Sequence, residues 1–135
     1  MSSSTQPMPV VTCGRRTAIG KPISQFLLPE YEVIHFLQSY EAAEAELPHL
    51  LAGRDPQSQN PNDVGTHDYS RSPRAVIFGR GFESEQVEEL KKKVAGIAKE
   101  PVAWVAGNPA DFPTGPPGPD YPQKAAADIK KVLDR

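Results

Sequence analysis

The chain has 135 residues, enough for one ordinary domain, of which 38% are hydrophobic and 24% charged. Its net charge of −2 argues against a nucleic-acid binder held by bulk electrostatics, and its one cysteine excludes an internal disulfide. No apolar run approaches the roughly 18 residues of a membrane span, and the start lacks the basic and apolar regions of a secretory signal, so we expect a cytoplasmic protein.

Four short apolar runs, each bounded by glycine or proline, predict four β-strands. They cover residues 9–13, 31–37, 74–78 and 102–105. Runs of this kind are typical of strands that helices cover on both faces, as in a parallel sheet. We expect residues 1–8 to form a flexible N-terminus and residues 9–135 to form a single domain.

Helical patterns fill the gaps between the first three strands. The first helix follows the basic residues Arg15 and Arg16 and covers residues 18–28. The second follows Ser39 and is interrupted at Pro48, where we expect a kink or a restart, because proline lacks the amide hydrogen that a helix interior needs. Gly53 is expected to end it.

The remaining two helices have clearer signals. Ser84 is expected to be the N-cap of a helix over residues 85–99, in which apolar residues recur every three or four positions (Val87, Leu90, Val94 and Ile97). Asp120 is expected to cap the last helix, with Pro122 in its first turn.

Strands that alternate with helices predict a small open parallel sheet of four strands, in the order 2-1-3-4, flanked by helices as a Rossmann-like three-layer α/β sandwich. Both edges of such a sheet would be exposed, so we expect a homodimer. Two polar segments belong on the surface: a long loop at residues 54–73 and a proline-rich loop at residues 108–119.

The turn from the first strand into the first helix is the strongest functional signal. Several backbone amides of such a turn point at one place, and the helix dipole adds positive charge there, so the turn suits an anion. The P-loop pattern is excluded because five residues, one too many, separate Gly14 from Gly20. The dinucleotide pattern GxGxxG is excluded because Arg16 stands where its second glycine would be.

Residues 13–20 (CGRRTAIG) resemble the TGxxxGxG cofactor loop of the short-chain dehydrogenase/reductase family, with Cys13 in place of the threonine and Ala18 in place of the middle glycine. The resemblance covers the N-terminal, cofactor-binding half of that family and implies a Rossmann-like fold that binds NAD(P). Arg15 and Arg16 would imply NADP, because basic residues in this loop accompany preference for the 2′-phosphorylated cofactor in that family.

Catalytic groups are not recognisable. The Tyr-x-x-x-Lys pair of that family is not matched, because Tyr121 and Lys124 are one residue too close and the chain is about half the family's length. Cys13 is either a thiolate activated by the anion-attracting turn or, as we expect, a buried structural thiol. His35 is expected to be an interior residue with satisfied hydrogen bonds rather than a ligand. Cysteine and histidine show no zinc-binding spacing, so we expect no metal.

The carboxyl ends of parallel strands meet at one edge of the sheet, where open α/β sheets bind ligands. We therefore expect an anionic ligand or a nucleotide at a site formed by Gly14, Arg15, Arg16, Thr17, Ile19, Gly20, Ser39, Gly79 and Arg80. Glycine after a strand is also ordinary turn chemistry, so a second interpretation stays open. In that interpretation, the chain is a non-catalytic interaction module that keeps a Rossmann-like fold for assembly.

Overall fold

The structure is a computed structural model that describes residues 7–14, 17–28, 30–56, 64–69, 72–79, 82–97, 102–106 and 121–133. The expected proline-rich loop at residues 108–119, the Asp120 cap and most of the expected flexible N-terminus lie outside these ranges. Met8, which was assigned to that N-terminus, belongs to the first strand.

The described chain alternates four strands and four helices. In order they are β1 (Met8–Cys13), α1 (Thr17–Leu27), β2 (Tyr31–Leu37), α2 (Tyr40–Leu51), β3 (Ala75–Phe78), α3 (Ser84–Lys93), β4 (Ala103–Ala106) and α4 (Tyr121–Leu133). The strands form a parallel sheet in the order β2-β1-β3-β4. The predicted open α/β sheet and its strand order are therefore confirmed, and the architecture is compatible with a Rossmann-like fold.

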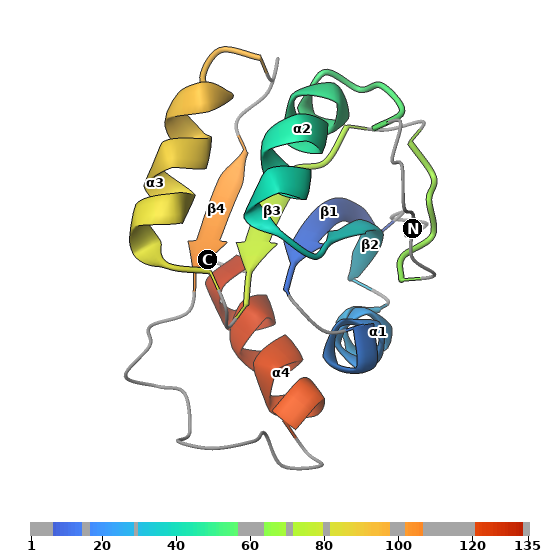
Figure 1. Cartoon of the computed structure of the whole chain (residues 1–135). Helices are drawn as coiled ribbons and strands as arrows, with labels where there is room; N and C mark the ends of the chain where they lie inside the picture. Colours follow the sequence, from blue (N-terminus) through green and yellow to red (C-terminus); the bar gives the residue numbers. More distant parts are fainter. Residues whose placement is uncertain are drawn as a thin grey trace.

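The helices form a layer on each face of the sheet (Figure 1). α2 and α3 cover one face, where their apolar side chains join those of the strands in one buried cluster (among them Val11, Leu37, Leu47, Val76 and Leu90). α1 and α4 cover the other face with a second cluster (among them Val10, Leu27, Val33, Ile77 and Ala126). Side chains on successive residues of a strand point to opposite faces, so β1 sends alternate residues into the two clusters.

β2 carries one residue more than β1 opposite it. Val10 pairs with Val33, but Val11 pairs with His35, so Ile34 is the extra residue of a β-bulge. The bulge interrupts the alternation of faces along β2. Ile34 joins the cluster under α2 and α3, and His35 also points to α2, where it contacts Glu46. Regular alternation would have sent His35 to the opposite face.

α2 runs through Pro48 to Leu51 as one helix, so the restart that was one of the two expectations does not occur. The helix then ends as expected at a glycine. Gly53 has φ +79° and donates to the carbonyl of Leu50 at 3.0 Å, and Arg54 donates to that of His49 at 2.8 Å. These two bonds form a Schellman motif, which needs a residue with positive φ.

α3 is shorter than expected and begins one residue earlier. Its N-cap is Glu83 rather than Ser84, and the amide of Glu83 donates to Gln86 Oε1 at 3.0 Å. The helix ends at Lys93 instead of residue 99, and residues 94–97 continue as turns. The expected apolar stripe nevertheless packs on the sheet, because one further turn still brings Val94 into the buried cluster.

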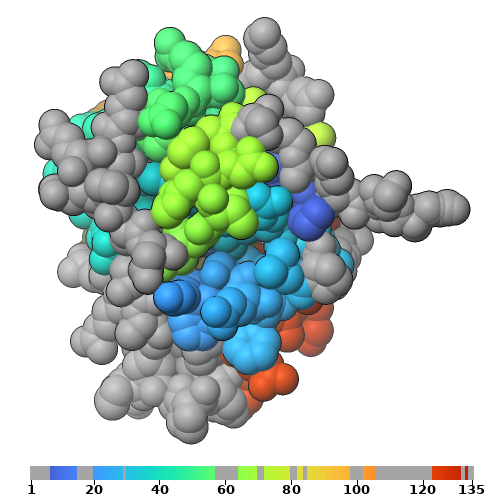
Figure 2. Space-filling model, turned by 90° about the vertical axis from the view of Figure 1, so that its right-hand side faces the viewer, coloured from blue at the N-terminus to red at the C-terminus, as the bar shows by residue number. Residues whose placement is uncertain are grey.

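The expectation of two exposed sheet edges is wrong for β2. The amides of Thr66 and His67 donate to the carbonyls of Val33 and Ile34, each at 2.9 Å. Successive carbonyls of a regular strand point in opposite directions, and the bulge lets these two point outward together. Figure 2 shows this covering segment, residues 64–69, in yellow-green above the blue α1. The expected surface loop is thus partly a structural element, and its Val64 is fully buried.

None of the helices in the described ranges combines the length and the apolar character that crossing a lipid bilayer requires.

Candidate functional site

The carboxyl ends of the four strands meet at one edge, and the strand order reverses there between β1 and β3. Gly14 follows β1 and Gly79 follows β3 at this point, and the amide of Gly79 donates to the carbonyl of Cys13 at 2.9 Å. Ligands of open α/β sheets bind at such a reversal. The structure therefore brings two of the glycines of the expected site together at the location that the sequence predicted.

Gly20 serves the packing of α1 on the sheet. A Cβ atom on Gly20 would lie 2.5 Å from Cε1 of the buried Phe36 ring, and one on Gly14 would lie 3.3 Å from the same atom. Gly20 thus allows the first turn of α1 to approach β2 closely. This close helix–strand contact is the role of the last glycine in dinucleotide-binding turns.

Thr12 has a buried hydroxyl group at the same edge. The residue is 6% exposed, and its Oγ1 has no hydrogen-bond partner among the described residues. Thr12 alternates with Val11 and Cys13, so its side chain points to the face covered by α1 and α4. An unpaired buried hydroxyl costs about 1–3 kcal/mol and calls for a physical explanation.

The structure describes some of the other expected site residues and not the rest. The hydroxyl of Ser39 accepts a hydrogen bond from the amide of Ala42 at 3.0 Å, so this side chain is the N-cap of α2. Thr17 begins α1, and Ile19 lies in its first turn. The three basic residues of the expected site (Arg15, Arg16 and Arg80) lie outside the described residues.

Cys13 is a buried thiol, as expected, and not an activated thiolate. The residue is 2% exposed, and burial raises its pKa well above the ordinary value. The thiolate alternative considered for this residue is therefore wrong, because its side chain points into the cluster under α2 and α3.

A second group of polar side chains lies where β2, α2 and the covering segment meet. His35 is 2% exposed, and both of its ring nitrogens are engaged: Nε2 lies 2.7 Å from Glu46 Oε1 and Nδ1 lies 2.8 Å from Tyr69 Oη. The expectation of an interior histidine with satisfied hydrogen bonds is confirmed. The three side chains form a continuous carboxylate–imidazole–hydroxyl chain, which we call the Tyr69 relay.

Burial dominates the electrostatics of the relay. Desolvation lowers the pKa of His35 below its ordinary value of 6.5, although Glu46 opposes this shift. Desolvation, with the charges of Asp55 and Glu46, raises the pKa of Tyr69 to about 12. The exposed ring of His67 lies 6.0 Å from that of His35 and 6.3 Å from that of Tyr69.

Sequence reasoning identified His35 as interior but missed its partners. A signal for Glu46 was present, because it lies three residues after Ala43 and directly before Leu47, on the inward face of α2. An acidic residue on an inward helix face usually has a buried partner. Tyr69 gives no such signal, because no periodic pattern surrounds it.

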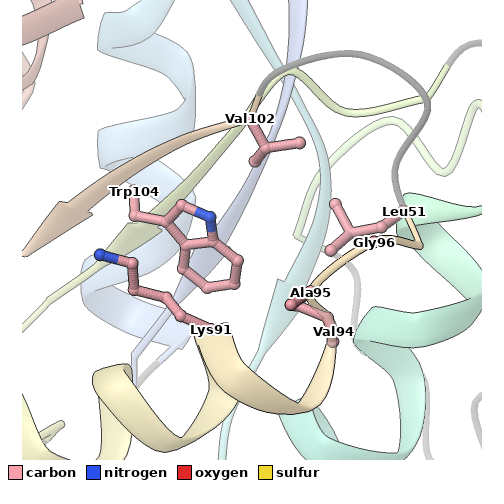
Figure 3. Close-up of a pocket in the computed structure, with 7 residues that line it drawn as sticks. All are labelled: Leu51, Lys91, Val94, Ala95, Gly96, Val102 and Trp104. Carbon is pink, nitrogen blue, oxygen red and sulfur yellow. The ribbon is translucent and has the colours of Figure 1, made fainter.

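A small hollow lies at the opposite end of the sheet, between the end of α3 and β4. Its volume is about 200 Å³, and seven residues line it (Leu51, Lys91, Val94, Ala95, Gly96, Val102 and Trp104). Figure 3 shows the indole of Trp104 and the side chain of Lys91 together on one side and Leu51 on the other. The indole also stacks on Phe78, with ring centroids 5.9 Å apart.

Among the residues that the structure places, no cluster of three or more His, Cys, Asp or Glu side chains could hold a metal ion. No protein-family model matches the chain, and no solved structure matches it. The chain is 34% identical over 128 residues to Kojic acid related protein 6 from Aspergillus oryzae (strain ATCC 42149 / RIB 40). That alignment covers 94% of this chain and 76% of the relative.

Proposed function

This chain belongs to the same protein family as Kojic acid related protein 6, and we propose that it binds a small anionic ligand of the nucleotide class at the carboxyl edge of its sheet. The ligand would lie over the β1–α1 turn, beside the reversal of strand order between β1 and β3. No reaction is assigned to this site.

The buried hydroxyl of Thr12 is the observation that carries the proposal. It lies one residue before Cys13, the end of β1, on the face covered by α1 and α4, and it lacks a partner within the described part of the chain. A ligand that reaches between the end of β1 and the start of α1 would supply that partner. Such a bond would also explain why a polar side chain occupies this position on an otherwise apolar face.

The charge of the turn supports an anion. The first turn of α1 contains no acidic residue, so no carboxylate of that turn competes for its amide groups. In the sequence, Arg15 and Arg16 directly precede this helix, and Arg80 follows the glycine after β3. A phosphate group would be bound by amides and guanidinium groups together, and NADP is our first candidate cofactor.

Ligand-induced stabilisation tests this proposal. Thermal unfolding is measured with NADPH, NADH, ATP, FMN, inorganic phosphate and kojic acid, the last because of the relative's name. A ligand at about a hundred times its dissociation constant should stabilise the protein by about 2.7 kcal/mol. Replacing Arg15 and Arg16 by alanine should abolish the shift, whereas the matched exposed pair Lys92→Ala and Lys131→Ala should keep it. No shift with any of these compounds contradicts the proposal.

Thr12→Val separates binding from folding. Valine has nearly the same shape and removes an unpaired hydroxyl, so the free protein should be as stable as the wild type or more stable. Loss of one hydrogen bond to the ligand should weaken binding by about 0.5–1.5 kcal/mol in titration calorimetry. Equal affinity of the variant and the wild type would remove Thr12 from the site.

An assembly function is the second candidate, and the open edge at β4 favours it. β4 is the outermost strand of the described sheet on that side, and Ala103 on it is exposed. An unpaired edge strand can pair with the same strand of another copy. In this alternative, the chain is a homodimer that keeps its Rossmann-like architecture for assembly rather than for a ligand.

A further inference from the structure

The Tyr69 relay lies on the α2 face of the sheet, opposite to the face of the Thr12 hydroxyl. Its three members come from different elements: His35 from β2, Glu46 from α2 and Tyr69 from the covering segment. The bulge at Ile34 places the imidazole on the α2 side. The hydrogen bonds that the backbone amides of Thr66 and His67 donate hold the covering segment against β2.

Gly65 makes this attachment close. It has φ +90°, and a Cβ atom there would lie 2.9 Å from the carbonyl oxygen of Val33. Any side chain at position 65 would push the segment away from the strand. His67 also has a positive φ, +59°, which is unusual for a residue with a Cβ atom. The backbone is thus held in an uncommon shape where it delivers Tyr69 to His35.

The direction of each hydrogen bond in the relay follows from the groups involved. A carboxylate only accepts, so Nε2–H of His35 donates to Glu46 at 2.7 Å. In a neutral imidazole the other nitrogen then carries a lone pair, and the hydroxyl of Tyr69 donates to Nδ1 at 2.8 Å. The phenol proton therefore already points at a base that a carboxylate orients.

We propose that Tyr69 is a nucleophilic hydroxyl that accepts an acyl group from activated esters, with His35 as its general base and Glu46 as the group that orients the imidazole. Carboxylate, imidazole and hydroxyl follow one another in the same order as in serine hydrolases, with a phenol in place of the serine and the two ring nitrogens exchanged. The outer member, Tyr69, is the one of the three that belongs to the covering segment, and it is partly exposed.

The reaction is a simple acyl transfer. Oη of Tyr69 forms a bond to the carbonyl carbon while its proton moves to Nδ1 of His35, and Glu46 stabilises the resulting imidazolium. The bond from the carbonyl carbon to the leaving oxygen then breaks, and that oxygen leaves with the bonding electron pair. The imidazolium returns its proton to the leaving group or to water. The product is an acyl ester of Tyr69, and neither oxidation nor reduction occurs.

The pKa values of Tyr69 and His35 determine which protonation state of each residue takes part in the reaction. Because its pKa is raised to about 12, Tyr69 remains protonated at neutral pH and reacts only through a base. The lowered pKa of His35 keeps the imidazole neutral and able to accept that proton. The ionisable groups that face His35 are Glu46 from α2, Asp55 after it, and His67 and Tyr69 from the covering segment.

p-Nitrophenyl acetate is the probe, and peptide mapping by mass spectrometry is the readout. Tyr40 is the control within the same molecule, because its hydroxyl accepts from Lys93 Nζ at 3.3 Å instead of donating to an imidazole. General-base assistance should make acetylation of Tyr69 about a hundredfold faster than that of Tyr40 near neutral pH. Equal or slower acetylation of Tyr69 in the wild-type protein overturns the proposal without any variant.

The pH dependence of the acetylation rate distinguishes a Tyr69 that His35 assists from a tyrosine that is merely exposed. Acetylation through His35 should be half-maximal below pH 6.5 and constant above it, whereas a tyrosine that reacts as its free phenolate gains rate far into the alkaline range. A rate at Tyr69 that increases steadily to high pH contradicts the role of His35.

Three variants assign the roles. Glu46→Gln can donate to Nε2 and reverse the imidazole tautomer, which should slow acetylation of Tyr69 by about a hundredfold while the folded protein keeps its circular dichroism. Tyr69→Phe should lose the acetylated peptide. His67→Ala should keep it, and its loss in that variant would make His67 the nucleophile and refute the proposal.

Discussion

Phe36 sets the distance between α1 and the sheet, and two glycines accommodate it. Its buried ring lies against Gly20 in the first turns of α1 and against Gly14 at the end of β1. The sequence predicted a glycine turn from these two residues without indicating what the glycines accommodate. A large aromatic ring from the neighbouring strand is a packing reason for them that is independent of any ligand.

Gly20→Ala should destabilise the protein. The new methyl group would lie 2.5 Å from Phe36 Cε1, and overpacking of a buried site typically costs about 1–3 kcal/mol, against about 1 kcal/mol gained in helix propensity. Urea unfolding measures the difference. Phe36→Leu should relieve the clash, so the double variant should be less destabilised than the sum of the two single variants. Additive effects would show that the ring and the glycine do not interact.

At the scale of elements, the covering segment replaces a missing strand. It pairs with two carbonyls of β2 and carries Tyr69 to the interior imidazole, so it closes the edge that the sequence left open. The same arrangement buries His35, and desolvation lowers the pKa of its imidazole although Glu46 opposes the shift. The unfolded chain therefore binds a proton at a higher pH than the folded chain does.

The lowered pKa of His35 predicts that the protein is less stable at acidic pH. Below pH 6.5 the unfolded state gains a proton on residue 35 that the folded state does not, so the free energy of unfolding should fall as the pH is lowered. Urea unfolding between pH 5 and 8 should show a steeper fall for the wild type than for His35→Gln. His49→Gln, on α2, should keep the wild-type slope. Equal slopes for the wild type and His35→Gln would contradict the buried neutral imidazole.

The sequence predicted the elements better than their details. Strands were found because short apolar runs ended at glycine or proline, and the parallel order followed from the alternation with helices. Helix ends were less certain, as at Ser84 and Lys93, because neighbouring polar residues can each cap a helix. The bulge at Ile34 could not be foreseen, because one extra residue in a buried apolar run leaves the sequence pattern unchanged. Without the bulge, the partners of His35 cannot be deduced.

At the scale of the whole molecule, the two sheet edges are unequal. The covering segment protects β2, whereas no described residue pairs with the outer side of β4. Only the edge at β4 therefore still supports the predicted homodimer. A dimer through β4 would bring the exposed Ala103 of each copy to the interface.

Light scattering after size exclusion at micromolar concentration tests this arrangement. A homodimer should have twice the mass of the 14.7 kDa chain, and Ala103→Lys should reduce the dimer because like charges would meet across the paired edges. Ala45→Lys, at an exposed position of α2, is the matched control and should leave the mass unchanged. A wild-type protein that stays at the mass of one chain excludes the dimer.

The bulge also separates the relay from the rest of the core. Deletion of Ile34 would return β2 to regular alternation, with His35, Phe36 and Leu37 on the faces that they now occupy. It would remove one core side chain and the carbonyl that holds His67. The anchor of Tyr69 thus depends on one extra residue, and the other residues of β2 keep their faces without it.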